Sequence, residues 1–377
     1  MPDRSAIVIG AGIVGLATAR ALALQGFQVD VFERSRIASG ASIRNFGMVW
    51  PVGQPTRKLY ERAIRTRNIW KEMAPEAGIW HDPVGSLHTA YQDDEWIVLR
   101  ELYEIFMQHG RPVELMNADT VQQKSSIALA QGCKGGLFSY DELIVDPRQA
   151  LAKLPAYLNA KWNIHFHWGQ TVTEVHGQTI HMAGKKFSAD LLFICNGSDF
   201  ETLYPEQFSK YPITKCKLQM MRFVQEDVSQ RIGPALCGGL SLIHYTGFKA
   251  APSWELLQQR VAQTMPEYIQ NGIHVMLSQN EMGELTIGDS HEYGLSPDPF
   301  DKQRINQLIL EYLQTFASLK NARQTESWNG VYAKLTNGEA DLFDSPEEGV
   351  FVLTATGGAG MTLSFGLAEE RVASVLS

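Results

Sequence analysis

The chain has 377 residues, of which 44% are apolar and 20% are charged, as in an ordinary globular protein. Its formal net charge is −8, whereas proteins that bind nucleic acids or anionic membranes usually carry a basic surface. The length predicts two domains that share one extended interior. These properties favour an enzyme for a small molecule, with neither nucleic acid nor membrane as a partner.

The four cysteines form no C-x-x-C pair, so we expect no zinc site, dithiol chemistry or disulfide framework. This pattern predicts a reducing, cytoplasmic location. The stretch Ser5–Leu24 is apolar enough to mimic a signal peptide, but three glycines interrupt it and Arg20 charges it, so we expect no cleaved signal. No other run approaches the ~20 apolar residues that span a bilayer.

The first forty residues predict a strand, a glycine-rich turn, a helix and a second strand that ends in an acid. Ala6–Ile9 is typical of a strand buried on both faces. The turn Gly10–Gly15 reads G-A-G-I-V-G, and the apolar face of the helix after it continues until Gly26. The strand Gln28–Phe32 comes next and is followed by Glu33. This is the order of elements in a βαβ unit that binds a dinucleotide.

Each part of this unit has a mechanical role. Gly10 allows the tight turn, Gly12 lets the backbone approach a pyrophosphate, and Gly15 lets the helix lie close to the strand. The helix N-terminus offers unpaired N–H groups to the phosphates. Glu33 can accept both hydroxyls of an adenosine ribose and would repel a 2′-phosphate, so NADP is not expected.

Two further segments place a glycine directly after a buried strand. Leu191–Cys195 ends in Asn196-Gly197, and Val350–Ala355 ends in the glycine-rich stretch Gly357–Thr362, which opens the last helix. A helix N-terminus stabilises the negative charge that a reduced flavin carries on its N1–C2=O edge. A nicotinamide cofactor needs no second helix start, so the sequence favours FAD.

These motifs resemble those of the D-amino-acid oxidase superfamily of FAD enzymes, to which glycine oxidase and sarcosine oxidase belong. The matching motifs occur in the order of that family and are Gly10-x-Gly12-x-x-Gly15, Glu33-Arg34, Asp146-Pro147-Arg148, Asn196-Gly197, Ile287-Gly288, Ser327-Trp328-x-Gly330 and the stretch 357–366. The resemblance implies an α/β protein (α+β overall) in which a Rossmann-like FAD-binding domain is interleaved with a substrate domain on an antiparallel sheet. We expect the first domain to comprise residues 1–84, 146–212 and 326–377, and the second to comprise residues 85–145 and 213–325.

The resemblance also implies how FAD is held. Relatives that bind flavin covalently use a cysteine near the motif tryptophan or a histidine just after the acid, and this chain has neither, so non-covalent binding is expected. Residues 42–48 match the family's loop beside the isoalloxazine ring. The residues expected to contact FAD are Gly10, Gly12, Ile13, Val14, Gly15, Glu33, Arg34, Ser42, Arg44, Asn45, Gly47, Met48, Asn196, Gly197, Trp328, Gly330, Gly357, Gly358, Gly360, Met361 and Thr362.

In this family the flavin takes a hydride equivalent from the carbon that bears the amine, and oxygen then reoxidises the flavin. The expected partners are therefore a small amine and an electron acceptor, with oxygen as the first choice. Sarcosine oxidase has a lysine, two residues before its strand-end glycine, that promotes the reaction with oxygen. Thr286 stands there in this chain. Either another cation takes this role or oxygen is not the main acceptor.

A second departure concerns the acidic group of the substrate. The amino-acid oxidases place an arginine two residues after the glycine of the Trp-x-Gly motif, where it binds the substrate carboxylate. This chain has Tyr332 there, and Lys334 follows on the same side of an extended segment. A lysine suits a tetrahedral anion, whereas a planar carboxylate favours arginine. Alternatively, Lys334 is a solvated surface residue.

Residues 49–55 look like a subgroup found among bacterial phosphonate-catabolism genes. That resemblance implies an aminophosphonate substrate, such as 2-aminoethylphosphonate or its N-methyl form. Arg44 could face the flavin or the substrate, or could anchor a phosphate or backbone group. His244 and the cluster 289–293 are further pocket candidates, because the cluster directly follows the Ile287-Gly288 strand end. The candidates for contact with the substrate are Lys334, Tyr332, His291, Arg44 and His244.

No metal is expected. His165, His167, His176 and His181 are close in sequence, but no cysteine or close carboxylate completes a site. Three other functions stay open: oxidation of an ordinary amino acid (glycine, sarcosine or a D-amino acid) with Arg44 on its carboxylate, an RNA-modifying flavoprotein domain, and a non-catalytic flavoprotein subunit. The excess of acidic over basic residues argues against the binding and modification of RNA. A homo-oligomer is left open.

Overall fold

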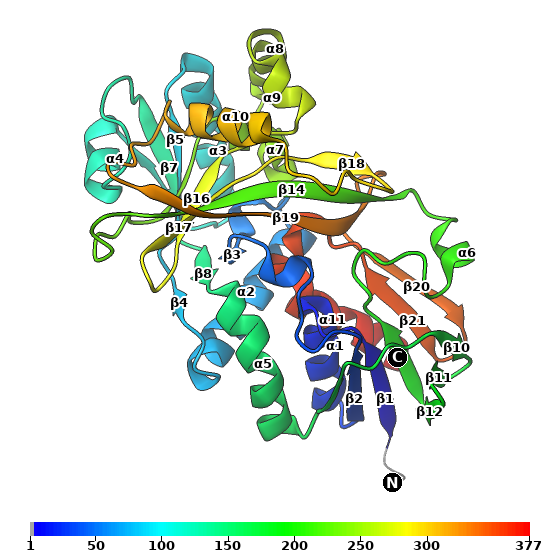
Figure 1. Ribbon diagram of the computed structural model, residues 1–377. Helices are drawn as coiled ribbons and strands as arrows, with labels where there is room; N and C mark the ends of the chain where they lie inside the picture. Colours follow the sequence, from blue (N-terminus) through cyan, green and yellow to red (C-terminus); the bar gives the residue numbers. More distant parts are fainter. Residues whose placement is uncertain (1–3) are drawn as a thin grey trace.

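The computed structural model describes residues 4–377 and contains a largely parallel sheet built around the first strand of the chain (Figure 1). Its strands are β1 Ser5–Ile9, β2 Gln28–Glu33, β9 His165–Trp168, β13 Leu191–Ile194, β20 Leu342–Glu347 and β21 Val350–Thr354. They lie in the order β20-β21-β13-β1-β2-β9, and β20 runs antiparallel to β21. The strands predicted near residues 6, 28, 191 and 350 are confirmed.

Different layers cover the two faces of this sheet. On one face lie the helices α1 Ile13–Leu24, α2 Lys58–Glu76, α5 Pro147–Trp162 and α11 Gly360–Leu376. On the other lie β10 Glu174–His176, β11 Thr179–Met182 and β12 Lys185–Ser188. Successive side chains of a strand point to opposite faces. Ala6 and Val8 therefore face the helices, and Ile7 and Ile9 face the three-stranded sheet β10-β11-β12.

A buried ion-pair network joins α2 to the last helix. The guanidinium of Arg62, 1% exposed, lies 2.7 Å from a carboxylate oxygen of Asp341 and 2.7 Å from one of Glu370. Arg371 also pairs with Asp341. Removing one partner of such a network leaves an uncompensated buried charge.

The second large sheet is mostly antiparallel. Its strands are β5 Ser86–Ala90, β6 Val113–Met116, β7 Gly135–Ser139, β14 Ile213–Val224, β15 Ala235–Cys237, β16 Met276–Gln279, β17 Glu284–Gly288, β18 Glu292–Gly294 and β19 Arg323–Leu335. The order is β18-β14-β17-β16-β15-β5-β7-β6, and β19 pairs with β14. The long β14–β19 pair crosses the middle of the molecule in Figure 1. One parallel and one antiparallel sheet, each drawing strands from distant segments, confirm the predicted fold class.

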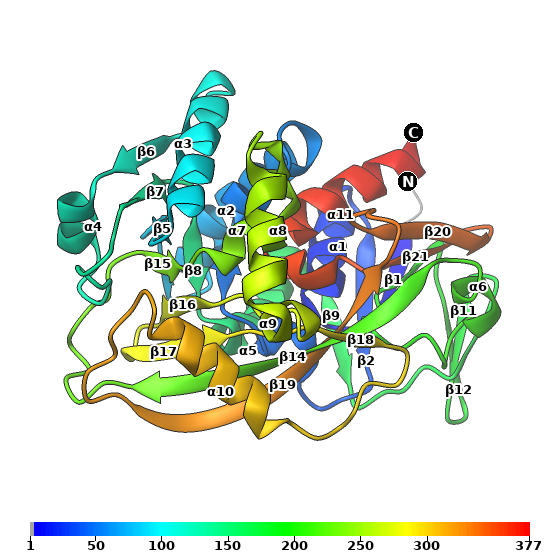
Figure 2. The same cartoon turned by 90° about the horizontal axis from the view of Figure 1, so that it is seen from above.

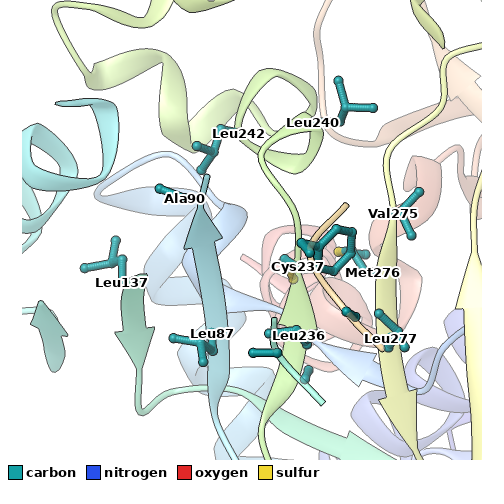
Figure 3. Close-up of a cluster of buried hydrophobic side chains, with 14 of the residues drawn as sticks. Leu87, Ala90, Leu137, Leu236, Cys237, Leu240, Leu242, Val275, Met276 and Leu277 are labelled. Carbon is teal, nitrogen blue, oxygen red and sulfur yellow. The ribbon is translucent and has the colours of Figure 1, made fainter. Parts of the chain in front are cut away.

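Apolar side chains fill the space between this sheet and its helices. Leu87, Leu236 and Leu277 lie on the neighbouring strands β5, β15 and β16 in the core drawn in Figure 3. In Figure 2, α10 Gln303–Leu313 lies across β14 and β17. The helices are α3 Asp93–Gln108, α4 Ala118–Lys124, α7 Leu240–His244, α8 Trp254–Thr264, α9 Pro266–Gln270 and α10 Gln303–Leu313.

Short elements connect the two large sheets. A small sheet has the order β3-β8-β4, with β3 Met48–Val49, β4 His81–Asp82 and β8 Leu143–Val145. The remaining helices are α6 Pro205–Phe208, η1 Ala41–Ile43, η2 Pro51–Gly53, η3 Thr246–Ala250 and η4 Gly357–Ala359. Among residues 4–377, none of the helices has both the length and the apolarity needed to cross a membrane.

Candidate active site

A cavity of about 720 Å³ lies between the carboxyl ends of β1, β2, β13 and β21 and the β14–β19 strands of the large sheet. Ligands of open α/β sheets bind at this edge. Most of the predicted site residues line the cavity: Gly10, Gly12, Ile13, Val14, Glu33, Arg34, Ser42, Arg44, Asn45, Met48, Asn196, Gly197, His244, His291, Gly330, Tyr332, Lys334, Gly357, Gly358, Gly360, Met361 and Thr362.

The first glycine turn has the close packing that its motif predicts. Gly10 has a φ of 104°, and a Cβ there would collide with the backbone of Cys195. A Cβ on Gly15 would collide with the carbonyl of Gly10, so α1 lies directly against the turn. Gly12 precedes α1 in extended conformation. Gly12 and the first residues of α1 line the cavity.

Glu33 faces this turn from the end of β2. Its Oε2 accepts the Ala11 N–H at 2.9 Å, and its Oε1 accepts the Ser35 N–H at 2.9 Å. The hydroxyl oxygen of Ser42 accepts the Ile13 N–H at 2.9 Å, which ties the 41–45 segment to the start of α1. These contacts hold the acid and the loop at the same end of the cavity.

The second glycine stretch forms a neighbouring part of the wall, because a Cβ on Gly360 would lie 3.3 Å from Ile13 Cγ2. Here η4 leads into α11, and the hydroxyl of Thr362 accepts the Trp50 N–H at 2.9 Å. A Cβ on Gly358 would lie 3.5 Å from the hydroxyl oxygen of Tyr332. The N-terminus of a 17-residue helix thus lies beside the tyrosine that replaces the family's arginine.

Some residues of the cavity lining have buried polar atoms without a hydrogen-bond partner among residues 4–377, which a bound group could contact. Within residues 4–377, Asn196 Oδ1 and Trp50 Nε1 are buried without a hydrogen-bond partner. Leaving such an atom unpaired costs about 1–3 kcal/mol. With the close backbone approach at Gly12 and the acid Glu33, these donors and acceptors fit the ribose, pyrophosphate and ring of FAD.

Three predicted residues lie outside the cavity wall. Gly15 packs α1 against the turn, as described above. Gly47 has a φ of 74°, and a Cβ there would collide with Val145. The Trp328 ring packs against Arg222, whose guanidinium carbon is 5.0 Å from the ring centre. These residues shape the backbone and the sheet, and their contact with FAD stays a prediction.

Lys334 and Tyr332 occupy the β19 part of the wall. Tyr332 is buried, and burial raises the pKa of its hydroxyl well above the usual value. Lys334 is half-buried, and its Nζ donates to the Tyr293 hydroxyl at 3.2 Å. It is therefore a cavity residue and not a fully solvated one. Arg44 is exposed and donates to the Asn329 carbonyl at 3.1 Å, which fixes it to the backbone of β19.

Three histidines gather near Lys334. The ring centres of His244 and His274 are 3.7 Å apart, and that of His291 lies 4.6 Å from His244 and 5.2 Å from His274. Burial lowers the pKa of His291 to about 4 and that of His244 well below its usual value, so both rings are neutral at neutral pH. His274 was not predicted, although a histidine directly before the apolar run Val275–Leu277 is a usable signal.

These three rings also bear on the question of a metal. Their nitrogens lie within 4.8 Å of one another. The ring planes, however, are inclined by only 16–33°. Ligands of a tetrahedral ion point their lone pairs at one centre, whereas near-parallel rings point theirs side by side. The geometry favours a stack over a metal site.

The histidines on β9 have a carboxylate neighbour that the sequence did not reveal. His167 Nε2 lies 2.6 Å from Asp30 Oδ1, and His165 Nδ1 lies 3.8 Å from the same atom. The expectation that no carboxylate is close to them was therefore wrong. Parallel pairing of β2 with β9 brings Asp30 opposite His165, across 135 positions of sequence that local spacing cannot bridge.

The sequence model described as "DAO: FAD dependent oxidoreductase" matches residues 5–373. The chain belongs to this family. It is therefore an FAD-dependent oxidoreductase, and the predicted cofactor and enzyme class are confirmed.

Solved structures share the fold at low identity. The glycine oxidase of Geobacillus kaustophilus is 18% identical, with a TM-score of 0.79 over 99% of this chain and 95% of that one. The L-proline dehydrogenase of P. horikoshii is also 18% identical, with a TM-score of 0.79 over 98% and 93% of the two chains.

Curated relatives match over part of their length. The tRNA 5-methylaminomethyl-2-thiouridine biosynthesis bifunctional protein MnmC of Saccharophagus degradans is 26% identical over 254 residues, which are 63% of this chain and 34% of that protein. The protein of the same name from Pseudomonas syringae is 22% identical over 375 residues, 91% of this chain and 54% of its own. The chain spans about half, or less, of the length of these relatives.

Proposed function

We propose that the protein oxidises a small amine that carries an anionic tail, with an aminophosphonate such as 2-aminoethylphosphonate or its N-methyl derivative as the substrate. The observation that carries this proposal is the pair Tyr332 and Lys334 on the cavity wall. A bidentate arginine for a planar carboxylate is replaced by a point charge, which suits the tetrahedral phosphonate. Arg44, the other candidate for a carboxylate, already donates to a backbone carbonyl.

The residues that would hold FAD form two groups on the cavity wall. The first glycine turn and Glu33 would hold the pyrophosphate and ribose, and the Gly357–Gly360 turn would face the flavin. FAD, when bound, accepts a hydride from the carbon that bears the amine. Lys334 would then orient the substrate by its anionic group, so that the amine end points away from β19 and into the histidine cluster.

An anaerobic screen tests this proposal. Purified protein with bound FAD is mixed with 2-aminoethylphosphonate, its N-methyl form, glycine, sarcosine and D-alanine, and the visible flavin absorbance is followed. Bleaching by an aminophosphonate supports the proposal, and bleaching only by the carboxylates contradicts it. A second assay then admits oxygen and measures peroxide, which separates an oxidase from a dehydrogenase.

An ordinary amino acid is the closest alternative substrate. In that case Arg44 would leave the Asn329 carbonyl and bind the carboxylate. Arg44→Leu separates the two proposals: a large loss of kcat/KM for a carboxylate substrate supports the alternative, whereas an unchanged value with an aminophosphonate supports ours.

The names of the curated relatives favour a second candidate, an RNA-modifying flavoprotein. RNA binding of this kind weakens steeply with salt, because phosphate contacts release counterions. A salt series of tRNA binding by the purified holoprotein tests it. Salt-dependent affinity would support this candidate, and its absence would support a small-molecule substrate. A flavin that no amine bleaches would instead indicate a non-catalytic subunit.

A further inference from the structure

One part of the cavity wall is an irregular segment, residues 50–56, that connects β3 to α2. Its residues Trp50, Gly53 and Gln54 line the cavity. Apart from the short turn η2, the segment has no regular secondary structure, so no strand ladder or long helix fixes its backbone. Contacts from other parts of the chain must therefore hold this wall in place.

Two buried ionisable side chains hold the segment at Val52. The Val52 N–H donates to Glu142 Oε1 at 2.9 Å, and the Val52 carbonyl accepts from Arg111 Nη1 at 3.4 Å. Arg111 is 2% exposed and Glu142 is 1% exposed. The Ser86 hydroxyl donates to the other oxygen of Glu142 at 2.9 Å, which ties that carboxyl group to β5. Val52, Arg111 and Glu142 do not line the cavity, so these contacts act from behind the wall.

The guanidinium of Arg111 serves this segment alone among residues 4–377. Besides the contact with Val52, its Nη2 donates to the Gln54 carbonyl at 2.9 Å and to the Thr56 hydroxyl at 3.0 Å. Within residues 4–377 it forms no ion pair, and burial lowers its pKa below the usual value. Its carbon lies 3.9 Å from the centre of the Tyr60 ring. A buried charge without a paired carboxylate is costly, and a planar fork that reaches three oxygens of one segment accounts for its position.

The helix η3 packs against the same segment. A Cβ on Gly247 would lie 2.7 Å from the carbonyl oxygens of Gly53 and Gln54, and a Cβ on Gly53 would lie 2.7 Å from the Tyr245 ring. The Gln54 carbonyl is therefore in contact with both Gly247 and Arg111. A side chain at position 247 would displace the carbonyl that Arg111 holds.

We propose that Arg111 is a positioning residue for substrate binding: by holding the backbone of residues 52–56, it fixes the part of the wall formed by Gly53 and Gln54, against which the amine binds. This rests on the proposed amine oxidation. If the segment is loose, binding has to order it first, and the apparent Kd rises by the inverse of the fraction of molecules in which it is already in place. Because neither Gly53 nor Gln54 is expected to hold FAD, the effect should fall on the amine and spare the cofactor.

Anaerobic stopped-flow reduction with the amine that bleaches the flavin separates binding from chemistry, because its concentration dependence gives an apparent Kd and a limiting rate. Arg111→Met removes the fork and keeps an apolar stem beside Tyr60. It should raise the Kd about tenfold or more, with the limiting rate within about threefold of wild type. Arg111→Lys keeps the charge without the fork and should fall between the two. Arg260→Met, which removes a guanidinium paired with Asp94 on another face of the protein, is the matched control and should leave the Kd unchanged. A wild-type Kd in Arg111→Met would overturn the proposal.

Hydrogen exchange of the holoprotein gives a readout that needs no substrate. In Arg111→Met the amides of Val52 and Gln54, followed in a peptide that contains residues 50–56, should exchange roughly 10- to 100-fold faster, while those of α8 keep their rates. Uniformly faster exchange, without this local effect, would indicate a general loss of stability and contradict the role of Arg111.

A variant on the other side of the segment keeps the test decisive if the Arg111 variants do not fold. Gly247→Ala displaces the Gln54 carbonyl from the side of η3 and leaves Arg111 intact. It should raise the apparent Kd and speed up exchange in the peptide 50–56. An unchanged Kd in a Gly247→Ala protein with faster local exchange would show that the position of this segment does not matter for the substrate.

The failure of this inference differs from that of the proposed function. If no amine reduces the wild-type flavin, the proposed amine oxidation is wrong, and a role of Arg111 in substrate affinity is wrong with it. If the wild type is reduced and Arg111→Met keeps both its Kd and its local exchange rates, amine oxidation stands and the role of Arg111 is wrong.

Discussion

Replacement of Lys334 by methionine isolates what one cation contributes to substrate recognition, because methionine removes the charge and keeps a similar side-chain length. Lys334 is half-buried on the cavity wall, and its Nζ donates a hydrogen bond to the Tyr293 hydroxyl at 3.2 Å. Two unit charges 4 Å apart attract by ~4 kcal/mol at an effective dielectric constant of 20. Partial exposure to solvent leaves about half of this, ~2 kcal/mol, which corresponds to a roughly 30-fold loss of kcat/KM for an aminophosphonate.

Stopped-flow reduction of the flavin without oxygen measures this loss directly, whatever the physiological acceptor is. Lys334→Arg keeps the charge and should stay within a few-fold of wild type. Lys320→Met, at an exposed position that is not part of the cavity wall, is the matched control for the loss of one charge. The ratio of flavin to protein absorbance checks that each variant still binds FAD. A Lys334→Met enzyme that reduces its flavin with aminophosphonates as efficiently as wild type would refute the role of Lys334 as the anion site.

Three further predictions concern the scaffold. Gly15→Ala places a Cβ on the carbonyl of Gly10, so the purified protein should lose bound flavin, seen as a low ratio of flavin to protein absorbance. Arg62→Met leaves the buried carboxylate of Asp341 with one partner fewer, and urea unfolding should show a loss of about 3–5 kcal/mol. Burial raises the pKa of Glu142 to about 7, above its value in the unfolded chain, so its stabilisation is complete at low pH and is lost as the pH rises through that value. Relative to Glu142→Gln, wild type should therefore lose about 3 kcal/mol of unfolding free energy between about pH 4.5 and pH 7, and a constant difference would contradict this.

The cofactor end of the cavity could be predicted from the sequence because its chemistry is local. Gly10, Gly12 and Gly15 fall within six consecutive positions, and a single turn joins the strand to the helix that they serve. Glu33 lies at the end of the next strand, where the βαβ geometry puts it. Spacing along the chain is then enough to place these groups relative to one another.

The substrate end could not be predicted in this way because its groups meet through sheet pairing. His274 precedes β16 and Asp289 follows β17, and the ladder of these two strands, with Met276 opposite Gly288, brings them together. A shift of that register by one residue would send the side chains of the shifted strand to the other face, so His274 and Asp289 would no longer lie together. His291 was found because it follows the same strand end in sequence, whereas the position of His274 before an apolar run does not say which residues it faces.

The arrangement of charges also explains how an acidic protein could take an anionic substrate. The net charge of −8 belongs to the whole surface, and at physiological salt an exposed charge is screened beyond about 8 Å. At the substrate end of the cavity, where His244 and His291 are neutral, Lys334 and Asp289 carry opposite charges. A substrate with an anionic group at one end and an ammonium at the other matches this pair in sign. Under the proposed function, Lys334 would select the anionic end of the substrate, and the Asp289 carboxylate would attract the ammonium end. Reversal of the charge at Lys334 or at Asp289 should therefore change the affinity for the substrate and the rate of flavin reduction by different factors.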